Sequence, residues 1–229
     1  MNYCISLMGR MKRCFCLTLF VTLLLAGFHG SAQSPRPFEK EVADLTAQDS
    51  AVRKKKIILF TGSSSVRFWK DVQSYFPEHN VVNRGFGGST MKDLLYYTDK
   101  LIIPYHPKMI FIYEGDNDLA GKMKPEEILA SADSILLLIR SKISKKVPVL
   151  FIATKPSVAR WSMKDEYLAY NQKLKDWTAT KKNVKYIDVW TPMLDANGEV
   201  QKDIFISDGL HMNKKGYDIW GRVIKPYIR

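Results

Sequence analysis

The chain of 229 residues carries 35 Lys and Arg residues against 23 Asp and Glu residues, which gives a formal net charge of +12. The basic residues are scattered or stand in short runs, and no nucleic-acid-binding motif accompanies them, so we interpret the charge as a solvated surface rather than a nucleic-acid site. Cysteine occurs only at Cys4, Cys14 and Cys16, which leaves the rest of the chain without a structural disulfide, a thiolate metal site or a cysteine nucleophile.

Residues 1–32 have the layout of a secretory signal peptide, with a basic start (MKR), an apolar run at 14–28 and the small residues Gly30 and Ala32. A membrane anchor is the alternative, but the apolar run is shorter than the roughly 20 residues that a spanning helix needs. A lipid anchor would need a cysteine just after LAG, where a phenylalanine stands. We therefore expect cleavage after Ala32 and a periplasmic or secreted protein without a membrane anchor.

The expected elements begin with a short helix at 37–47, where Phe38, Val42 and Leu45 recur at helical spacing. It belongs to an N-terminal extension, 33–56, and we expect it to pack on the outside of the fold. Apolar runs typical of buried strands follow at 57–61, 81–86, 109–114, 147–153 and 184–189. Helical patterns separate and follow these runs, at 65–76, 89–103, 125–143, 163–181 and 213–227.

Short, almost wholly apolar strands that alternate with helices predict a parallel sheet covered on both faces. We therefore expect residues 57–229 to form one α/β domain, a three-layer α/β/α sandwich around a five-stranded parallel sheet with the flavodoxin-like strand order 2-1-3-4-5. Such sheets place their functional groups beyond the carboxyl ends of the strands. Polar motifs at those ends are the first candidates for chemistry.

Four polar, glycine-bearing segments fall at these strand ends: TGSSSV, NRGFGGST and EGDNDL after the first three strands, and SDGLHMNKKGY after the fifth. Each also has an alternative interpretation. The first could be a helix cap, the second a tight turn, the third a turn or a cation site, and the fourth a capped helix start. Together they supply a hydroxyl nucleophile, a histidine base with an aspartate three residues before it, and donors for an oxyanion. This combination favours acyl transfer over four unrelated turns.

The four segments resemble the conserved blocks of the SGNH/GDSL hydrolases, esterases and lipases with a flavodoxin-like fold, and the likeness spans about 57–227. The GSSSVRFW opening and the DGLHMNKKGY close are similar to the platelet-activating-factor acetylhydrolase-like branch. The resemblance implies the nucleophile Ser64, the base His211 and its orienting Asp208. It also implies oxyanion donors from the backbone N–H groups of Ser64 and Gly88 and from the Asn117 amide, with no cofactor and no metal.

Two positions depart from that pattern, because Ser63 stands where the family usually has aspartate and Asp116 where threonine is usual. Asp116, with the neighbouring acids, could also suggest a cation site, although the spacing fits no known loop. We expect Phe68 and Trp69, which follow the serines, to lie in the core.

The segment KPSVARW follows the fourth strand, so Arg160 and Trp161 are candidates for substrate binding at the catalytic edge, with a loop anchor as the alternative. The expected function is an exported serine esterase that cleaves short-chain, chiefly acetyl, esters of small molecules or carbohydrates. The alternatives are a lysophospholipase or lipase-type acylhydrolase and a non-catalytic acyl-sugar-binding module. Nucleotide binding is disfavoured because no phosphate-binding loop follows any strand. The oligomeric state stays open.

Overall fold

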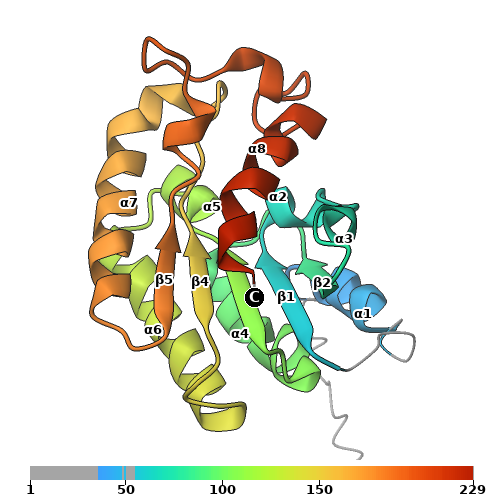
Figure 1. Ribbon diagram of the computed structural model, residues 1–229. Helices are drawn as coiled ribbons and strands as arrows, with labels where there is room; N and C mark the ends of the chain where they lie inside the picture. Colours follow the sequence, from blue (N-terminus) through green and yellow to red (C-terminus); the bar gives the residue numbers. More distant parts are fainter. Residues whose placement is uncertain (1–35, 48, 50–54, 229) are drawn as a thin grey trace, which may run out of the picture. The chain divides into compact units, whose positions relative to one another are not determined.

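The computed structural model describes residues 36–47, 49 and 55–228, and the predicted signal peptide lies outside these ranges. A five-stranded sheet in the order β2-β1-β3-β4-β5 forms the centre of the fold, and every neighbouring pair of strands is parallel (Figure 1). The strands are β1 (Ile57–Gly62), β2 (Asn80–Gly85), β3 (Met109–Tyr113), β4 (Val149–Ile152) and β5 (Val184–Ile187). The predicted fold class and strand order are confirmed.

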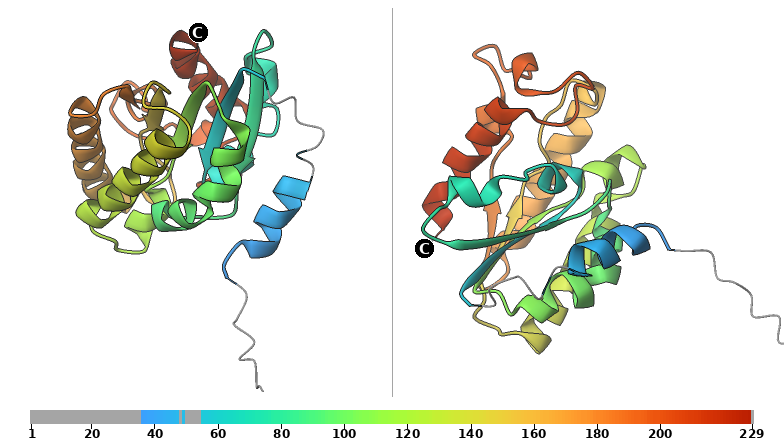
Figure 2. Two further views of the ribbon diagram at one scale, coloured as in Figure 1. Left: turned by 90° about the horizontal axis from the view of Figure 1, so that it is seen from below. Right: turned by 90° about the vertical axis from the view of Figure 1, so that its right-hand side faces the viewer.

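Helices cover both faces of this sheet, as the two views of Figure 2 show. One face carries α1 (Glu39–Ala47), α4 (Met91–Leu101), α6 (Pro125–Lys142) and α7 (Lys164–Ala179). The other carries α2 (Ser64–Arg67), α3 (Val72–Tyr75) and α8 (Lys214–Ile224). Helix α5 (Asp116–Ala120) follows the carboxyl end of the central strand, β3. Single 3-10 turns link these elements at η2 (Ile103–Tyr105), η3 (Trp161–Met163), η4 (Thr191–Met193), η5 (Lys202–Ile204) and η6 (Lys225–Tyr227).

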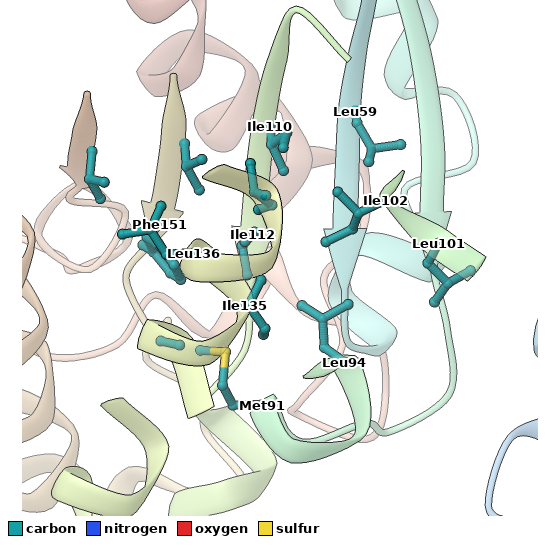
Figure 3. Packing of buried hydrophobic residues seen from close by; sticks show 14 of the residues in the cluster. Leu59, Met91, Leu94, Leu101, Ile102, Ile110, Ile112, Ile135, Leu136 and Phe151 are labelled. Atoms are coloured by element: carbon teal, nitrogen blue, oxygen red, sulfur yellow. The ribbon is translucent and has the colours of Figure 1, made fainter. Parts of the chain in front are cut away.

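The apolar strands divide their side chains between two cores, because successive residues of a strand point to opposite faces. In β1, Ile57 and Leu59 join the core under α4 and α6, whereas Ile58 and Phe60 join the core under α2 and α8. Figure 3 shows the first of these cores, where side chains of β1, β3 and β4 meet those of α4 and α6. Burial on both faces explains why these strands have continuous apolar runs rather than alternating ones.

The strand register brings the polar segments to one edge of the sheet. Gly62, the last residue of β1, lies opposite Gly85 of β2 and Tyr113 of β3. Gly62 has φ +126°, and a Cβ atom there would lie 2.0 Å from the Tyr113 carbonyl oxygen, so only glycine fits where the chain turns toward α2. The segments that follow β1, β2 and β3 therefore start side by side.

The single helix expected at 65–76 is wrong, because the chain forms two short helices, α2 and α3, with a break between them. The amide of Asn83 on β2 donates to the carbonyl oxygens of Val66 and Trp69, 2.7 and 3.0 Å away. These bonds satisfy carbonyl groups that a continuous helix would have used. In the described part of the chain, no helix has both the length and the hydrophobicity needed to cross a membrane.

Candidate active site

Ser64, His211 and Asp208 form a continuous row of hydrogen-bonded side chains, although 147 residues separate the serine from the histidine. Nε2 of His211 lies 2.9 Å from Oγ of Ser64, and Nδ1 of His211 lies 2.6 Å from Oδ2 of Asp208. The other carboxylate oxygen of Asp208 accepts the backbone N–H groups of Leu210 and His211 at 2.8 and 2.9 Å. The backbone of the turn before α8 thus holds the Asp208 carboxylate against the imidazole of His211.

Of the three consecutive serines, only Ser64 is placed for proton transfer to an imidazole. Ser63 and Ser65 are each 2% exposed, whereas Ser64, the first residue of α2, is half-buried. The hydroxyl of Ser63 instead accepts a hydrogen bond from the amide of Asn117 at 2.8 Å. The sequence alone could not separate these three hydroxyl groups by environment.

The Asp208 carboxylate is held in its charged form. Partial burial would raise its pKa, but hydrogen bonds from the ring and the backbone of His211 outweigh that effect and lower the pKa from 3.8 to about 2. Because this carboxylate accepts a hydrogen bond from Nδ1–H of His211, it favours the tautomer whose Nε2 can accept a proton from Ser64. It also stabilises the imidazolium that would result.

The predicted oxyanion donors gather beside Ser64. Gly88 is exposed, and a Cβ atom on it would lie 3.7 Å from Nδ2 of Asn117. Neither the Ser64 N–H nor the Gly88 N–H has a hydrogen-bond acceptor among the described residues, so both are free to bind an incoming oxygen. Nδ2 of Asn117 donates to Ser63 and to the carbonyl of Ser89 at 2.9 Å, and it would exchange one of these bonds for an oxyanion.

The guanidinium of Arg160 is bound by protein groups around Asn117. It donates to Oδ1 of Asn117 at 3.0 Å and to the carbonyl and Oδ1 of Asp116 at 2.9 and 2.5 Å. Because Oδ1 of Asn117 is held by Arg160, the amide nitrogen faces Gly88 and the serines. The residue predicted to bind substrate therefore contacts the candidate oxyanion site from behind.

A buried charged cluster lies behind the site, centred on Asp116. Lys155, with no exposed surface, lies 3.4 Å from Oδ2 of Asp116, and the hydroxyl groups of Tyr113 and Tyr167 donate to the carboxylate at 2.8 and 2.6 Å. Burial would raise the pKa of Asp116, but the charges of Lys155 and Arg160 lower it to about 2. Sequence reasoning missed Lys155, although a lysine that ends the apolar run VLFIAT is the signal that could have found it.

Glu114, the residue after β3, is a second buried acid behind the site. It is 1% exposed, its Oε1 accepts from the hydroxyl of Ser89 at 2.6 Å, and its Oε2 has no hydrogen-bond partner among the described residues. Burial, reinforced by the nearby carboxylate of Asp118, raises the pKa of Glu114 well above its ordinary value. Glu114 is therefore protonated in the folded protein at a pH where it would ionise in the unfolded chain.

This raised pKa predicts a pH-dependent stability difference between the wild type and Glu114→Gln. The folded state holds the extra proton between 4.5, the ordinary value, and the folded pKa, so wild-type stability falls as the pH rises through that window, by at most about 1.4 kcal/mol per pH unit. Glutamine has no proton to lose. We expect the melting temperature of Glu114→Gln, relative to the wild type, to rise from pH 4.5 to pH 8. A difference in melting temperature that stays constant across this pH range would contradict a raised pKa for Glu114.

Aromatic side chains occur on the segments that follow β1, β4 and β5. The ring of Phe68 is 40% exposed and packs edge-on against the ring of His211 with centroids 4.8 Å apart, so its expected place in the core is wrong, whereas Trp69 is fully buried. Trp161 stacks on Trp190 with centroids 5.9 Å apart, and its indole N–H donates to Glu199. Phe68 lies in the turn between α2 and α3, and its ring belongs to neither apolar core.

No group of three or more His, Cys, Asp or Glu side chains that could hold a metal ion occurs within residues 36–47, 49 and 55–228. Each of the three acids considered for such a site is bound to other protein groups. Asp116 is bound by Lys155 and Arg160, and Asp208 is bound by His211. Asp118 accepts the backbone N–H groups of Met91 and Gly115, which ties α5 to α4.

The GDSL-like Lipase/Acylhydrolase family matches residues 49–219, which include all four polar segments. The chain therefore belongs to this family of acylhydrolases and esterases. No protein with a curated description matches the sequence. The SGNH/GDSL resemblance of the four segments is confirmed at the level of the family.

Solved structures show the same fold at low sequence identity. A candidate platelet activating factor from Streptococcus pneumoniae is 21% identical with a TM-score of 0.73, covering 82% of this chain and 91% of that one. A GDSL-like lipase from Bacteroides thetaiotaomicron is 19% identical with a TM-score of 0.69 over 81% and 96%. A catalytic mutant of an acetylxylan esterase from Geobacillus stearothermophilus is 17% identical with a TM-score of 0.61 over 75% and 93%.

Proposed function

We propose that this protein is an exported serine esterase that hydrolyses short-chain, chiefly acetyl, esters through Ser64, His211 and Asp208. The observation that carries the proposal is the hydrogen-bonded row from Oγ of Ser64 through the imidazole of His211 to the carboxylate of Asp208. A serine hydroxyl is a weak nucleophile until a base takes its proton, and this row supplies the base and the group that orients it.

In the first half-reaction, Oγ of Ser64 attacks the ester carbonyl carbon while its proton passes to Nε2 of His211. The carbonyl oxygen becomes an oxyanion, which the N–H groups of Ser64 and Gly88 and the amide of Asn117 would stabilise. The imidazolium then protonates the leaving alcohol oxygen as the carbon–oxygen bond breaks. The products of this step are the free alcohol and an acyl group bonded to Ser64.

In the second half-reaction, a water molecule takes the place of the alcohol. His211 removes one proton from the water, the hydroxyl attacks the acyl carbonyl, and the same donors hold the second oxyanion. Collapse of this intermediate breaks the bond to Ser64, whose oxygen regains its proton from His211. The acid is released and the enzyme returns to its starting state without any cofactor.

We propose an acetylated carbohydrate as the substrate class. The fold is shared with an acetylxylan esterase, and the partly exposed ring of Trp161, on the loop that follows β4, is held by stacking on the buried ring of Trp190 after β5. Flat aromatic surfaces suit the apolar faces of sugar rings. Export, which rests on the leader pattern of residues 1–32, would bring the enzyme to such substrates.

A second candidate is an ester with a longer apolar group, because exposed apolar side chains border the turn that carries Asp208 and His211. Phe68 is 40% exposed, Ile206 49% and Val158 39%. Phe68 packs against the His211 ring, and a Cβ atom on Gly209 would lie 3.2 Å from Val158. These side chains could receive an acyl chain longer than acetyl.

One substrate panel separates these candidates: acetylated xylan, acetylated monosaccharides, lysophospholipid, and p-nitrophenyl esters from acetate to octanoate, with Ser64→Ala as the blank. The proposed function predicts Ser64-dependent release that is fastest for acetyl esters and includes acetate from the acetylated sugars. A rate that rises with chain length and lysophospholipid turnover would support the second candidate. No Ser64-dependent release from any substrate would contradict the proposed function and leave a binding module.

Asn117→Ala is expected to lower kcat by about 10²–10³-fold, the usual cost of losing one oxyanion donor. KM and the melting temperature should change little, because Asn117 is half-buried at the start of α5 and its amide bonds link loops rather than the core. Steady-state kinetics with p-nitrophenyl acetate, together with thermal unfolding, measure both quantities. Unchanged kcat would remove Asn117 from the oxyanion site.

A further inference from the structure

Helix α1 lies outside the residues that match the family, 49–219, yet it contacts the two segments that carry the nucleophile and an oxyanion donor. Its side chain Glu41 is the point of contact. One oxygen, Oε1, accepts the backbone N–H of Gly87 at 3.0 Å and the Nε–H of Arg67 at 2.8 Å. A single carboxylate from the N-terminal extension thus joins the loop after β2 to the helix that begins with Ser64.

Gly87 is the residue directly before the candidate donor Gly88, so its conformation sets the direction of the Gly88 N–H. Gly87 is buried with φ +34°, and a Cβ atom there would lie 2.1 Å from the ring of Phe38. Without a side chain, glycine has many accessible backbone conformations. Here the Glu41 carboxylate accepts its N–H and the Phe38 ring packs over its Cα, and these two contacts restrict the conformations open to it.

The docking of α1 does not depend on Glu41 alone. Val42 is fully buried in the main core, and the ring of Phe38 packs edge-on against Phe86 with centroids 5.4 Å apart. The hydroxyl of Tyr97 on α4 donates to the carbonyl of Pro37 at 2.7 Å. These contacts hold the helix in place, so Glu41 is available for a different task.

We propose that Glu41 is a positioning residue for ester hydrolysis, which holds the Gly87 N–H and thereby aims the Gly88 N–H at the oxyanion. This inference rests on the proposed esterase function. It assigns the N-terminal extension a role in turnover rather than only in packing. Because Glu41 acts through the backbone, its loss costs less than the loss of a donor itself, which typically costs about 10²–10³-fold.

The test compares Glu41→Ala, Glu41→Asp and Glu41→Gln with the wild type, all in the full-length chain, using p-nitrophenyl acetate. Alanine removes the acceptor, aspartate keeps the charge but is too short to reach Gly87, and glutamine keeps an acceptor oxygen at the same distance. Asp44→Ala, on the exposed face of α1 where Asp44 pairs with Lys40, is the matched control. Hydrogen exchange of the peptide containing Val42 reports whether α1 stays docked.

We expect kcat to fall about 10-fold in Glu41→Ala and Glu41→Asp, with KM within about 3-fold of the wild type and Val42 protection retained. Glu41→Gln and Asp44→Ala should keep kcat within about 3-fold of the wild type. A KM–kcat split of this kind indicates an interaction made in the transition state, which a merely structural role would not produce.

Four results would overturn the inference: unchanged kcat in Glu41→Ala or Glu41→Asp, a rise in KM alone, a glutamine variant as slow as the alanine variant, or loss of Val42 protection in both slow variants. Ser64→Ala, measured beside them, keeps the two proposals apart. A wild type that turns over only with Ser64 intact, beside a fully active Glu41→Ala, would refute the positioning role and leave the esterase. A wild type without Ser64-dependent turnover would refute both.

Discussion

Ser64→Ala is expected to reduce kcat for p-nitrophenyl acetate by about 10⁴–10⁶-fold, the range seen when a serine hydrolase loses its nucleophile. The physical reason is that no other hydroxyl in the segment can replace it. Oγ of Ser64 is the serine oxygen within 2.9 Å of Nε2 of His211, whereas the hydroxyl of Ser63 is bonded to Asn117. A residual rate above the uncatalysed one would come from the oxyanion donors and substrate binding.

The matched control for this variant is Ser65→Ala, in the next residue of the same helix. Ser65 is 2% exposed and its side chain has no bond to His211, so we expect its kcat to stay within about 3-fold of the wild type. Both variants should keep the wild-type melting temperature to within a few degrees. A Ser64→Ala enzyme that keeps more than a tenth of wild-type kcat would show that the chemistry lies elsewhere.

Asp116→Asn is expected to destabilise the fold by about 3–5 kcal/mol, the usual cost of removing one partner of a buried ion pair. Its carboxylate is the counter-charge for Lys155, which has no exposed surface, and for the guanidinium of Arg160. Asparagine is nearly isosteric but neutral, so it leaves two cationic groups close together without a counter-charge. Urea unfolding at pH 7 measures the change as a lower midpoint with an unchanged m-value.

A double-mutant cycle isolates this electrostatic cause. Adding Lys155→Met removes the uncompensated ammonium, so the double variant should recover much of the stability lost in Asp116→Asn. Asp203→Asn, at an exposed pair with Lys215, is the surface control and should leave the urea midpoint unchanged. If the double variant lost more unfolding free energy than the two single variants lose together, the electrostatic explanation would be contradicted.

The pH dependence of the same variant has a defined sign. Because the folded-state pKa of Asp116 lies at about 2, below its ordinary value of 3.8, the carboxylate stabilises the fold fully above about pH 4. That contribution is lost as the pH falls through 2. The stability gap between wild type and Asp116→Asn should therefore be widest near neutral pH and should narrow in acid, opposite to the behaviour expected for Glu114.

The sheet and the four polar segments could be predicted from the sequence because both depend on local patterns. Continuous apolar runs, as in 57–61 and 109–114, mark strands buried on two faces, and in parallel sheets the segments after such strands share one edge. That topology brings the serine segment and the His211 segment to the same edge, the family resemblance points to Ser64 among the three serines, and the hydrogen bond itself is seen only in the structure.

Other features depend on contacts that no local pattern encodes. The helix expected at 65–76 is interrupted because Asn83, on another strand, takes two of its carbonyl groups. The position of Arg160 after the fourth strand predicts the edge at which it lies, but its contact with Asn117 depends on how two loops meet. Glu41 looks like an ordinary surface acid of an amphipathic helix, and only the tertiary structure brings it to Gly87.

The central claim is that Ser64, activated by His211, forms the covalent acyl-enzyme. Peptide mapping by tandem mass spectrometry after reaction with a fluorophosphonate, a reagent that bonds to activated serines with loss of fluoride, tests it most directly. The account predicts one phosphonyl adduct, located on Ser64 and formed in parallel with loss of esterase activity, and very slow labelling of His211→Ala. An adduct at Ser63, Ser65 or outside this segment, or full inactivation with Ser64 unmodified, would contradict it.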